Sequence, residues 1–387
     1  MEIKNLKKAA ERITAAIGNK ERIILYGDAD LDGISSVIVM EETIKTLGGK
    51  VEVCYFPDRE VEGYGINETA LKFLKKYSPA LLITVDCGIG NFKEIKLAKK
   101  LGFEIIILDH HEPLDKLPVA DIIVDPKQKG DRYPFKRLAA AGVVFKVSEL
   151  LLENSRKEIT QSLKKSFLEL VALATIADMM PRQSENRVFI EEGMQSIKNS
   201  FRPGIKAFFE INSLKKCPDF DQKISKIISI LNVRDVKNRL PAGFRLLTSP
   251  SPEEAKKIIK ILLLKNKTRK EETEKIIEEI EKRIENKKDP LIFEGDRNFN
   301  SALLSSVASI ISRTYSKPTF LYKKMAEETQ GTVRAPNDLN SVDLMKKCSK
   351  YLLTYGGHPQ ASGFRVKNKN LEKFRICLIN NLKRMKK

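Results

Sequence analysis

Two patterns of apolar and polar residues alternate along the first half of the chain. Short apolar runs rich in β-branched residues are typical of buried strands. Apolar residues that recur every three or four positions are typical of helices that pack on a core. Strands are expected at 23–26, 51–56, 80–85, 104–108 and 121–124, and helices at 2–17, 34–47, 67–76, 91–101, 139–152 and 162–177. Such alternation of strands and helices predicts an α/β fold with a parallel sheet covered by helices on both faces.

The pattern changes after residue 200. Residues 204–247 have a mixed pattern that favours helices, and residues 252–287 carry apolar residues at helical spacing within a run dense in Lys and Glu. The charged run is typical of the solvated face of a long connecting helix, which Asp289-Pro290 ends. A smaller α/β region follows, with strands near 291–293 and 318–323 and a helix near 302–315. We therefore expect a larger α/β domain over residues 1–200, a helical connector over 201–290 and a smaller α/β domain over 291–387.

Composition narrows the class of protein. The 387 residues are too many for one ordinary core, and the net charge of +19 indicates a polyanionic partner such as nucleic acid. A lysine-rich source composition explains that charge equally well. No apolar run approaches the roughly 20 residues of a membrane span, and the first residues lack the apolar core of a signal peptide. The five cysteines are widely scattered, which favours neither a zinc site nor a disulfide framework. A reduced, cytoplasmic protein without membrane association is expected.

Residues 23–36 combine a buried strand with a cluster of carboxylates. Asp28, Asp30 and Asp32 follow the strand at alternate positions, and the chain turns at Gly33. Three carboxylates at the carboxyl edge of a sheet repel one another unless a cation lies among them. Hard oxygen ligands favour a divalent metal ion, and a polar loop that is merely acidic is the alternative.

Other acidic residues also end apolar segments. Asp86 and the run Asp109-His110-His111 each follow an apolar strand, and Asp178 ends an apolar helix. The chain contains only three histidines, and two of them are adjacent in this run. Because the carboxyl ends of parallel strands meet at one edge of a sheet, we expect these side chains to converge with the first aspartate cluster.

Carboxylates with one imidazole suit Mn²⁺ or Mg²⁺ better than structural zinc. Two such ions, roughly 3.5–4 Å apart, would clamp a phosphodiester and activate a water molecule for in-line attack. Asp86, at the end of the expected central strand, is our choice for the carboxylate that bridges them. Adjacent histidines point in different directions, so one can bind metal while the other faces the substrate.

These residues resemble the motifs of the DHH phosphoesterase superfamily and, within it, of RecJ-type single-strand exonucleases. The resemblance covers roughly residues 20–365. Its five motifs are Gly27-Asp28-Ala29-Asp30-Leu31-Asp32-Gly33, Thr84-Val85-Asp86-Cys87-Gly88, Asp109-His110-His111-Glu112-Pro113, Thr175-Ile176-Ala177-Asp178 with Asn186-Arg187, and Gly356-Gly357-His358-Pro359-Gln360-Ala361-Ser362-Gly363, which is similar to the GGH signature of the DHHA1 domain. Further RecJ-like positions are Arg59, Glu62-Gly63-Tyr64-Gly65, Asp125-Pro126-Lys127 and Ala141-Gly142-Val143-Val144-Phe145-Lys146.

The resemblance implies a DHH domain joined by a long helical connector to a DHHA1 domain, with the active site in the cleft between them. It implies a nuclease that uses two Mn²⁺ or Mg²⁺ ions to release mononucleotides from single-stranded DNA, or also RNA, in DNA repair and replication, with 5′-to-3′ polarity favoured. The implied metal ligands are Asp28, Asp30, Asp32, Asp86, His110 and Asp178, and the implied catalytic residues are Asp86, Asp109, His110 and His111. The implied substrate contacts are His111, Arg334, Gly356, Gly357 and His358.

Alternatives from other classes remain. One is a phosphodiesterase of the same superfamily that acts on oligoribonucleotides or cyclic dinucleotides, which the high positive charge disfavours. Another is a non-catalytic replication scaffold, which is disfavoured because no expected metal ligand is missing. The short chain resembles archaeal RecJ-like proteins, relatives that associate with replicative helicase components such as GINS-like proteins. The sequence leaves open the strand polarity, the choice between DNA and RNA, whether Asp28 binds metal directly, and the roles of Asn232, Arg234 and Arg239.

Overall fold

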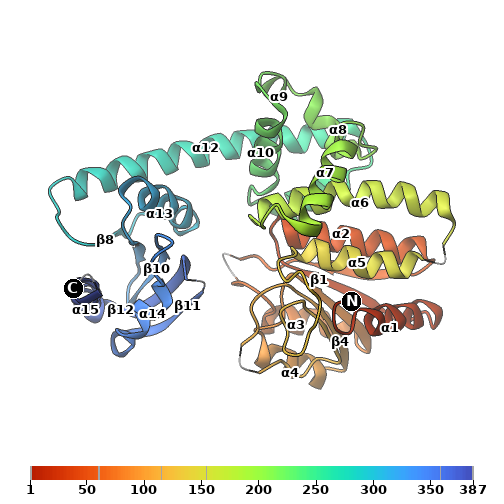
Figure 1. Cartoon of the computed structure of the whole chain (residues 1–387), viewed down its shortest axis with the longest axis horizontal. Helices are drawn as coiled ribbons and strands as arrows, with labels where there is room; N and C mark the ends of the chain where they lie inside the picture. Colours follow the sequence, from red (N-terminus) through yellow and green to blue (C-terminus); the bar gives the residue numbers. More distant parts are fainter. Residues whose placement is uncertain (1, 60–61, 115, 154, 358, 386–387) are drawn as a thin grey trace. The chain divides into compact units, whose positions relative to one another are not determined.

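The computed structural model describes residues 2–59, 62–114, 116–153, 155–357 and 359–385. The chain forms two compact units, Met1–Asn266 and Lys267–Lys387, and helix α12 (Pro252–Ile284) runs across the boundary between them (Figure 1). Each unit has its own five-stranded sheet and its own apolar cores. The domain boundaries that we expected from the sequence, after residues 200 and 290, stay a prediction.

The first unit is built on a parallel sheet, as the sequence predicted. Its strand order is β2-β1-β3-β4-β5, and every neighbouring pair is parallel. The strands are β1 (Ile23–Gly27), β2 (Val51–Tyr55), β3 (Ala80–Val85), β4 (Phe103–Leu108) and β5 (Ile122–Val124). The central strand is therefore β3, and all its residues are buried. Burial on both faces explains why these strands are continuous apolar runs rather than alternating ones.

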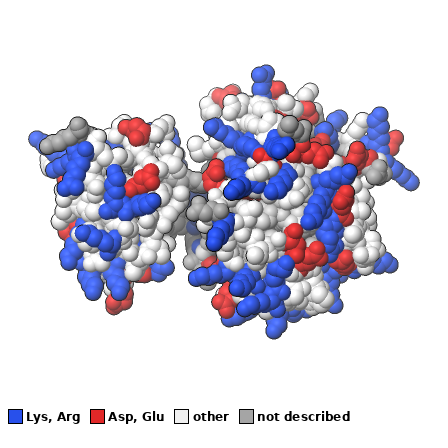
Figure 2. Space-filling model, turned by 60° about the horizontal axis from the view of Figure 1, so that its bottom comes forward, with Lys and Arg blue, Asp and Glu red and all other residues white. Residues whose placement is uncertain are grey.

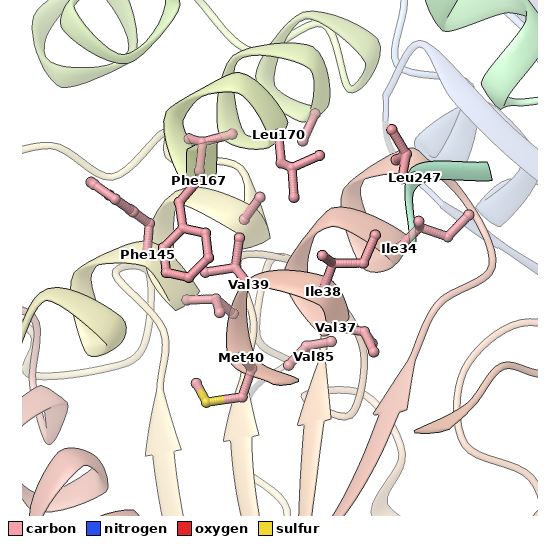
Figure 3. Packing of buried hydrophobic residues seen from close by; sticks show 14 of the residues in the cluster. Ile34, Val37, Ile38, Val39, Met40, Val85, Phe145, Phe167, Leu170 and Leu247 are labelled. Carbon is pink, nitrogen blue, oxygen red and sulfur yellow. The ribbon is translucent and has the colours of Figure 1, made fainter. Parts of the chain in front are cut away.

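Helices cover both faces of this sheet. Strand residues such as Leu25 and Ile83 pack with four helices on one face, namely α1 (Leu6–Gly18), α2 (Leu31–Thr46), α5 (Ala140–Leu152) and α6 (Lys157–Ala177). The intervening residues Ile24 and Leu82 pack with the helices of the other face, α3 (Glu68–Leu74), which the short 3₁₀ helix η1 (Lys75–Tyr77) continues, and α4 (Phe92–Lys100). Figure 3 shows the first of these cores, where α2 lies between the sheet and helices α5 and α6. Each fully buried Leu, Ile or Phe contributes roughly 1.5–3 kcal/mol to folding.

The first unit continues past residue 180. Helix α7 (Ser184–Ile197) packs against α6. Residues of the next helices, among them Phe208, Ile230 and Leu246, join the core around α2. These elements are α8 (Pro203–Glu210), α9 (Asn212–Lys215), α10 (Phe220–Leu231), the hairpin β6 (Val236–Lys237) and β7 (Leu240–Pro241), and α11 (Ala242–Leu247). The helical interpretation of 204–247 is thus correct, except for the small hairpin.

The second unit has a mixed sheet with the order β11-β12-β10-β9-β8. Only β8 and β9 run parallel, and the other pairs are antiparallel. The elements are β8 (Ile292–Asp296), α13 (Ser301–Tyr315), β9 (Thr319–Lys324), β10 (Glu328–Arg334), α14 (Ser341–Lys346), η2 (Ser349–Tyr351), β11 (Leu352–Gly357), β12 (Ala361–Lys367), η3 (Asn368–Asn370) and α15 (Leu371–Met385). One core joins the sheet to α14 and α15, and another joins it to α13 and the end of α12.

Part of this second sheet could not be predicted from the sequence pattern, because two of its strands contain glycines. Gly331 lies inside β10, where a Cβ atom would come within 2.3 Å of the Phe364 ring. Gly356 and Gly357 end the edge strand β11. Glycine is depleted in strands because it costs entropy and offers no side chain to pack, so these strands lack the usual signal.

Two findings concern the expectations about cysteines and membranes. Cys348 and Cys377, 29 residues apart, form a disulfide that joins the segment after α14 to α15. The expectation of unpaired cysteines was wrong for this pair, because spacing along the sequence does not reveal which side chains the fold brings together.

No helix in the described part of the chain is long and apolar enough to span a membrane.

Candidate metal centre

The first sheet gathers carboxylates and imidazoles at the carboxyl edge of its strands. Asp28 to Asp32 follow β1, Asp86 follows β3 and Asp109 to His111 follow β4, while Asp178 caps the C-terminus of α6. Among the described residues, three groups have ligand atoms within 4.8 Å of one another: Asp28, Asp30 and Asp86; Asp32, His110 and Asp178; and Asp86, His110 and His111. All six residues expected to bind metal are therefore close together.

The first aspartate cluster is shaped by the start of α2. Asp30 is the N-cap residue, and its Oδ1 accepts hydrogen bonds from the backbone N–H groups of Asp32 (3.1 Å) and Gly33 (3.2 Å). A Cβ at Gly33 would lie 2.3 Å from the Asp28 carbonyl oxygen, so only glycine allows this close turn. The two oxygens of Asp32 accept from the N–H groups of Ala140 and Ala141 at the start of α5, each at 2.8 Å. Asp32 is 2% exposed.

Asp86 lies at the end of the central strand in an unusual backbone conformation. Its φ of 60° is left-handed, which costs energy for a residue with a Cβ, and its N–H donates to the Leu108 carbonyl at 3.0 Å. Burial raises the pKa of the Asp86 carboxyl well above its usual value, and the nearby Asp32 carboxylate raises it further. A strained, buried carboxyl group of this kind is typical of a functional site.

His110 is held so that one ring nitrogen faces the acids. Its Nδ1 is 3.0 Å from the Leu138 carbonyl oxygen, to which it can donate, and this leaves Nε2 free to bind. Nε2 lies 3.2 Å from Asp86, 3.7 Å from Asp32 and 3.7 Å from Asp178. Burial lowers the pKa of His110, which keeps the imidazole neutral. A neutral imidazole fixed by a carbonyl is the usual form of a metal-binding histidine.

His111 points to different partners. Its Nδ1 lies 2.8 Å from Asp109 Oδ1, and Tyr64 Oη lies 3.0 Å from its Nε2. Burial by itself lowers the pKa of His111, but the hydrogen bond to Asp109 and the negative charges of Asp109, Asp178 and Asp32 together raise it overall. Asp109 is fully buried and also accepts from the N–H groups of Ile89, His110 and His111, so its pKa is lowered in spite of burial. Asp109 thus orients His111 and does not face the other carboxylates.

Arg59 supplies a positive charge at the edge of the cluster. Its guanidinium forms ion pairs with Asp28 and, at 2.9 Å, with Asp30. The sequence motifs contained Arg59 and Tyr64, but nothing in the pattern showed that one contacts the aspartates and the other His111. The backbone groups of Leu138, Ala140 and Ala141 left no signal at all, because any residue supplies a carbonyl or an N–H.

Asp178 closes the cluster from the helical side. Burial raises the pKa of its carboxyl to about 6 and that of Asp32 to about 7, with neighbouring carboxylates adding to both. Asp178 Oδ2 is buried and has no hydrogen-bond partner among the described residues. Asn186, at the start of α7, donates to the carbonyls of Arg137 (2.7 Å) and Pro181 (3.1 Å), which ties the segment before α5 to the segment after Asp178.

The remaining predicted substrate residues lie in the second unit. Arg334 ends β10, and its guanidinium donates to Ser309 Oγ (3.0 Å) and Thr332 Oγ1 (3.2 Å); no described acidic residue forms an ion pair with it. Gly356 and Gly357 are exposed at the end of β11, where Gly357 has a φ of 128°. His358 lies outside the described residues. The expected position of the active site between two domains stays a prediction.

Two of the residues whose roles were open have partners in the first unit. Asn232 Oδ1 accepts from the N–H of Leu31 at 3.1 Å, so it caps the start of α2 beside the aspartates. Arg239 lies in the two-residue turn of the β6–β7 hairpin, donates to Tyr55 Oη at 3.0 Å and stacks on Phe73.

Comparison with known proteins identifies the family. Residues 22–175 match the model described as the DHH family, N-terminal domain. The first unit therefore contains a DHH-family N-terminal domain. The chain is 33% identical over 382 residues to the single-stranded-DNA-specific exonuclease RecJ of Bacillus subtilis, a match that covers 97% of this chain and 48% of the relative. It is 28% identical to RecJ of Escherichia coli, covering 97% of this chain and 68% of that protein. The chain thus spans about half the length of the B. subtilis relative.

Solved structures agree with the family and the fold. A crystal structure of exonuclease RecJ bound to manganese matches this chain with a TM-score of 0.82 and 26% identity, covering 99% of this chain and 96% of the other. RecJ from Thermus thermophilus in complex with Mn²⁺ matches with a TM-score of 0.83 and 25% identity, covering 99% and 55%. The motif resemblance and the two-domain α/β fold are confirmed. The archaeal affinity stays a prediction.

Proposed function

We propose that this chain is a metal-dependent exonuclease that hydrolyses phosphodiesters of single-stranded nucleic acid. The observation that carries the proposal is the position of His110 Nε2, which faces the carboxylates of Asp32, Asp86 and Asp178 within 3.2–3.7 Å. An imidazole nitrogen among three carboxylates is a divalent-metal site by its chemistry. The matches to RecJ proteins along almost the whole chain support the substrate class.

The residues present fit divalent ions. The donors are carboxylate oxygens and one neutral imidazole, which is the set that Mn²⁺ and Mg²⁺ take. The orphaned Oδ2 of Asp178 and the raised pKa values of Asp32, Asp86 and Asp178 show carboxylates held close together in a dry site, where they repel one another. A bound cation relieves that repulsion. Two of the matched RecJ structures are complexes with Mn²⁺, which supports the same ion here.

The three ligand groups suggest how two ions would be held. Asp32, His110 and Asp178 would hold one ion, and Asp28, Asp30 and Asp86 the other. Asp86 also lies 3.2 Å from His110, which supports it as the bridge between the two positions. Two ions held by these residues would supply positive charge against a phosphate and would lower the pKa of a bound water molecule. Arg59 would share Asp28 and Asp30 with the second ion.

The protein's own groups would then position the phosphate. Asp109 holds the His111 ring through Nδ1. The other ring nitrogen, Nε2, lies beside the Tyr64 hydroxyl and is therefore the one left for a substrate oxygen. The raised pKa of His111 favours the protonated form, which can donate to a phosphate oxygen. In the second unit, Arg334 and the N–H groups at Gly356 and Gly357, with His358, are proposed to hold the phosphate backbone of the strand.

Cleavage of end-labelled single strands tests the proposal. The wild-type protein should release mononucleotides from DNA or RNA strands with Mn²⁺ and none with EDTA. Asp86→Ala should abolish cleavage while strand affinity in EDTA stays within about twofold, because Lys and Arg contacts with phosphates supply most of that affinity. The control is Asp221→Ala, an exposed aspartate in the first turn of α10, which should cleave normally.

The same assay separates the alternatives. Cleavage restricted to dinucleotides and short oligomers would replace the exonuclease with an oligonucleotide phosphodiesterase. Retained cleavage in Asp86→Ala would refute the metal centre. Strands labelled at the 5′ or the 3′ end would give the polarity, for which we propose 5′ to 3′. An association with GINS-like replication proteins stays a prediction.

A further inference from the structure

A basic groove lies in the second unit between the segment after α14 and one face of α15. Its volume is about 320 Å³. The residues that line it are Lys347, Lys350, Tyr351, Lys373, Ile376, Cys377, Asn380, Asn381 and Arg384. None of these is among the residues assigned above to metal, catalysis or substrate binding, so the metal centre does not explain the groove.

The charge in this groove is of one sign. Lys347, Lys350, Lys373 and Arg384 are all exposed, and no acidic residue lines the groove. Among the described residues none of these four forms an ion pair, whereas Arg375 on the same helix pairs with both Asp289 and Glu372. Another cavity of the second unit, of about 640 Å³, is lined by residues of both signs. These two cavities of the second unit therefore differ in the charge of their lining, and the face of the protein shown in Figure 2 carries both blue and red patches.

The two walls of the groove are fixed to each other. The disulfide between Cys348 and Cys377 joins them covalently, and Asn381 Nδ2 on α15 lies 3.7 Å from Cys348 Sγ on the other wall. Leu344 and Met345 on one side pack in the same core as α15, through Phe374, Leu378 and Leu382. Positive charges held at fixed positions bind an anionic chain with less loss of conformational entropy than charges on a mobile tail.

The groove also contains apolar, amide and aromatic side chains between its charged residues. Lys373 and Arg384 lie on one stripe of α15, eleven residues or about 16 Å apart along the axis. Between them lie Ile376, which is 49% exposed, and the amide of Asn380. Tyr351 is half-buried on the facing wall, with Lys350 Nζ 5.1 Å from its ring centre. Cations interleaved with an aromatic ring and apolar surface are what a single strand needs for its phosphates and bases.

We propose that this groove is a second binding site for single-stranded nucleic acid, and that it holds the phosphodiester backbone of the strand outside the catalytic residues. The inference extends the proposed function and rests on it for the choice of ligand. The charge complementarity and the absence of acidic lining residues favour this occupant over an acidic protein segment. DNA and RNA share the backbone chemistry, and the experiment below compares them.

The test measures binding without cleavage. A variant with Lys347→Ala, Lys350→Ala and Lys373→Ala is compared with a control variant, Lys7→Ala, Lys8→Ala and Lys369→Ala, which removes the same charge from exposed lysines elsewhere. Fluorescent 20-nucleotide DNA and RNA strands are titrated in EDTA at several salt concentrations, and circular dichroism checks the fold. The groove variant should bind at least about tenfold more weakly at low salt. Its slope of log affinity against log salt should fall by about 2, since each phosphate contact on a single strand contributes about 0.7.

Each outcome decides the proposal. A loss for both DNA and RNA, with the control near wild type, supports a backbone site, and a loss for only one of them supports a site selective for that nucleic acid. Equal binding by the groove and control variants overturns the proposal. The proposal is also overturned if the groove mutations weaken the binding of a labelled polyglutamate peptide and leave the binding of the strands unchanged. Binding is measured in EDTA, which prevents cleavage. The failure of the metal centre to cleave strands would therefore disprove the proposed function without affecting this binding measurement.

Discussion

The two sheets of this protein place opposite charges in opposite environments. In the first unit, a parallel sheet buried on both faces presents Asp32, Asp86 and His110 at its carboxyl edge, and these side chains are nearly inaccessible to water. In the second unit, a mostly antiparallel sheet ends in the exposed edge strand β11, and its surface carries Arg334 and the basic groove. The chain thus buries most of its candidate metal ligands, and it exposes Gly356, Gly357 and the lysines of the basic groove.

The difference follows from the chemistry that each region would perform. Metal ligands must be close together and partly dry, so that their repulsion is relieved only by a cation. Contacts with a long phosphate chain must be reachable from solvent, and each is individually weak. The first region should therefore respond to single mutations and to pH, and the second to salt and to the number of charges removed.

The largest expected effect separates the two adjacent histidines. His110→Ala removes the nitrogen that faces three carboxylates, so Mn²⁺ binding should weaken and kcat/KM should fall by at least about 10³-fold, because the ions supply several kcal/mol. His111→Ala should leave Mn²⁺ affinity within about threefold and lower kcat about 10²-fold through loss of a proton donor. Calorimetric titration with Mn²⁺ and steady-state kinetics measure both. Equal loss of metal in the two variants would contradict the division of roles.

A change of pH should affect the two regions differently. Burial raises the pKa of Asp32 to about 7 and that of Asp178 to about 6, so protons compete with Mn²⁺ for both carboxylates below these values. Mn²⁺ affinity should therefore fall by about 100-fold between pH 8 and pH 5.5. Strand binding in EDTA should change by less than about threefold, because lysines keep their charge across this range. A pH-independent Mn²⁺ affinity would show that these carboxylates are not ligands.

Two glycines give a smaller and purely structural comparison. Gly33→Ala places a Cβ 2.3 Å from the Asp28 backbone, so it should lower the free energy of unfolding by about 1–3 kcal/mol. Gly356→Ala meets no atom within 4 Å in its exposed strand, and its effect should stay within about 0.5 kcal/mol. Urea denaturation of both variants measures the difference. Similar losses in the two variants would mean that the aspartate turn is less tightly packed than the structure shows.

Part of the fold and the site could be predicted from local patterns. The apolar pattern predicted every strand of the first sheet, and the acids and histidines that follow its strands or end helix α6 include all members of the ligand groups. The second sheet was predicted less completely, because Gly331, Gly356 and Gly357 interrupt the strand signal. The disulfide between Cys348 and Cys377 and the contact of Arg59 with two aspartates escaped the pattern, since both join residues that are far apart in the sequence.

The sequence by itself determined the parallel sheet, the family motifs and the types of residue that the metal centre would use, because strand periodicity and motif spacing are local properties. Only the tertiary structure decided which atom of each residue faces which partner. The Leu138 carbonyl directs His110 Nε2 toward the acids, and Asp109 holds His111 Nδ1, which lies 3.9 Å from Asp86. The basic groove likewise exists only because packing of α15 brings cations from two segments to one surface. Such arrangements depend on long-range packing, which periodicity along the chain does not record.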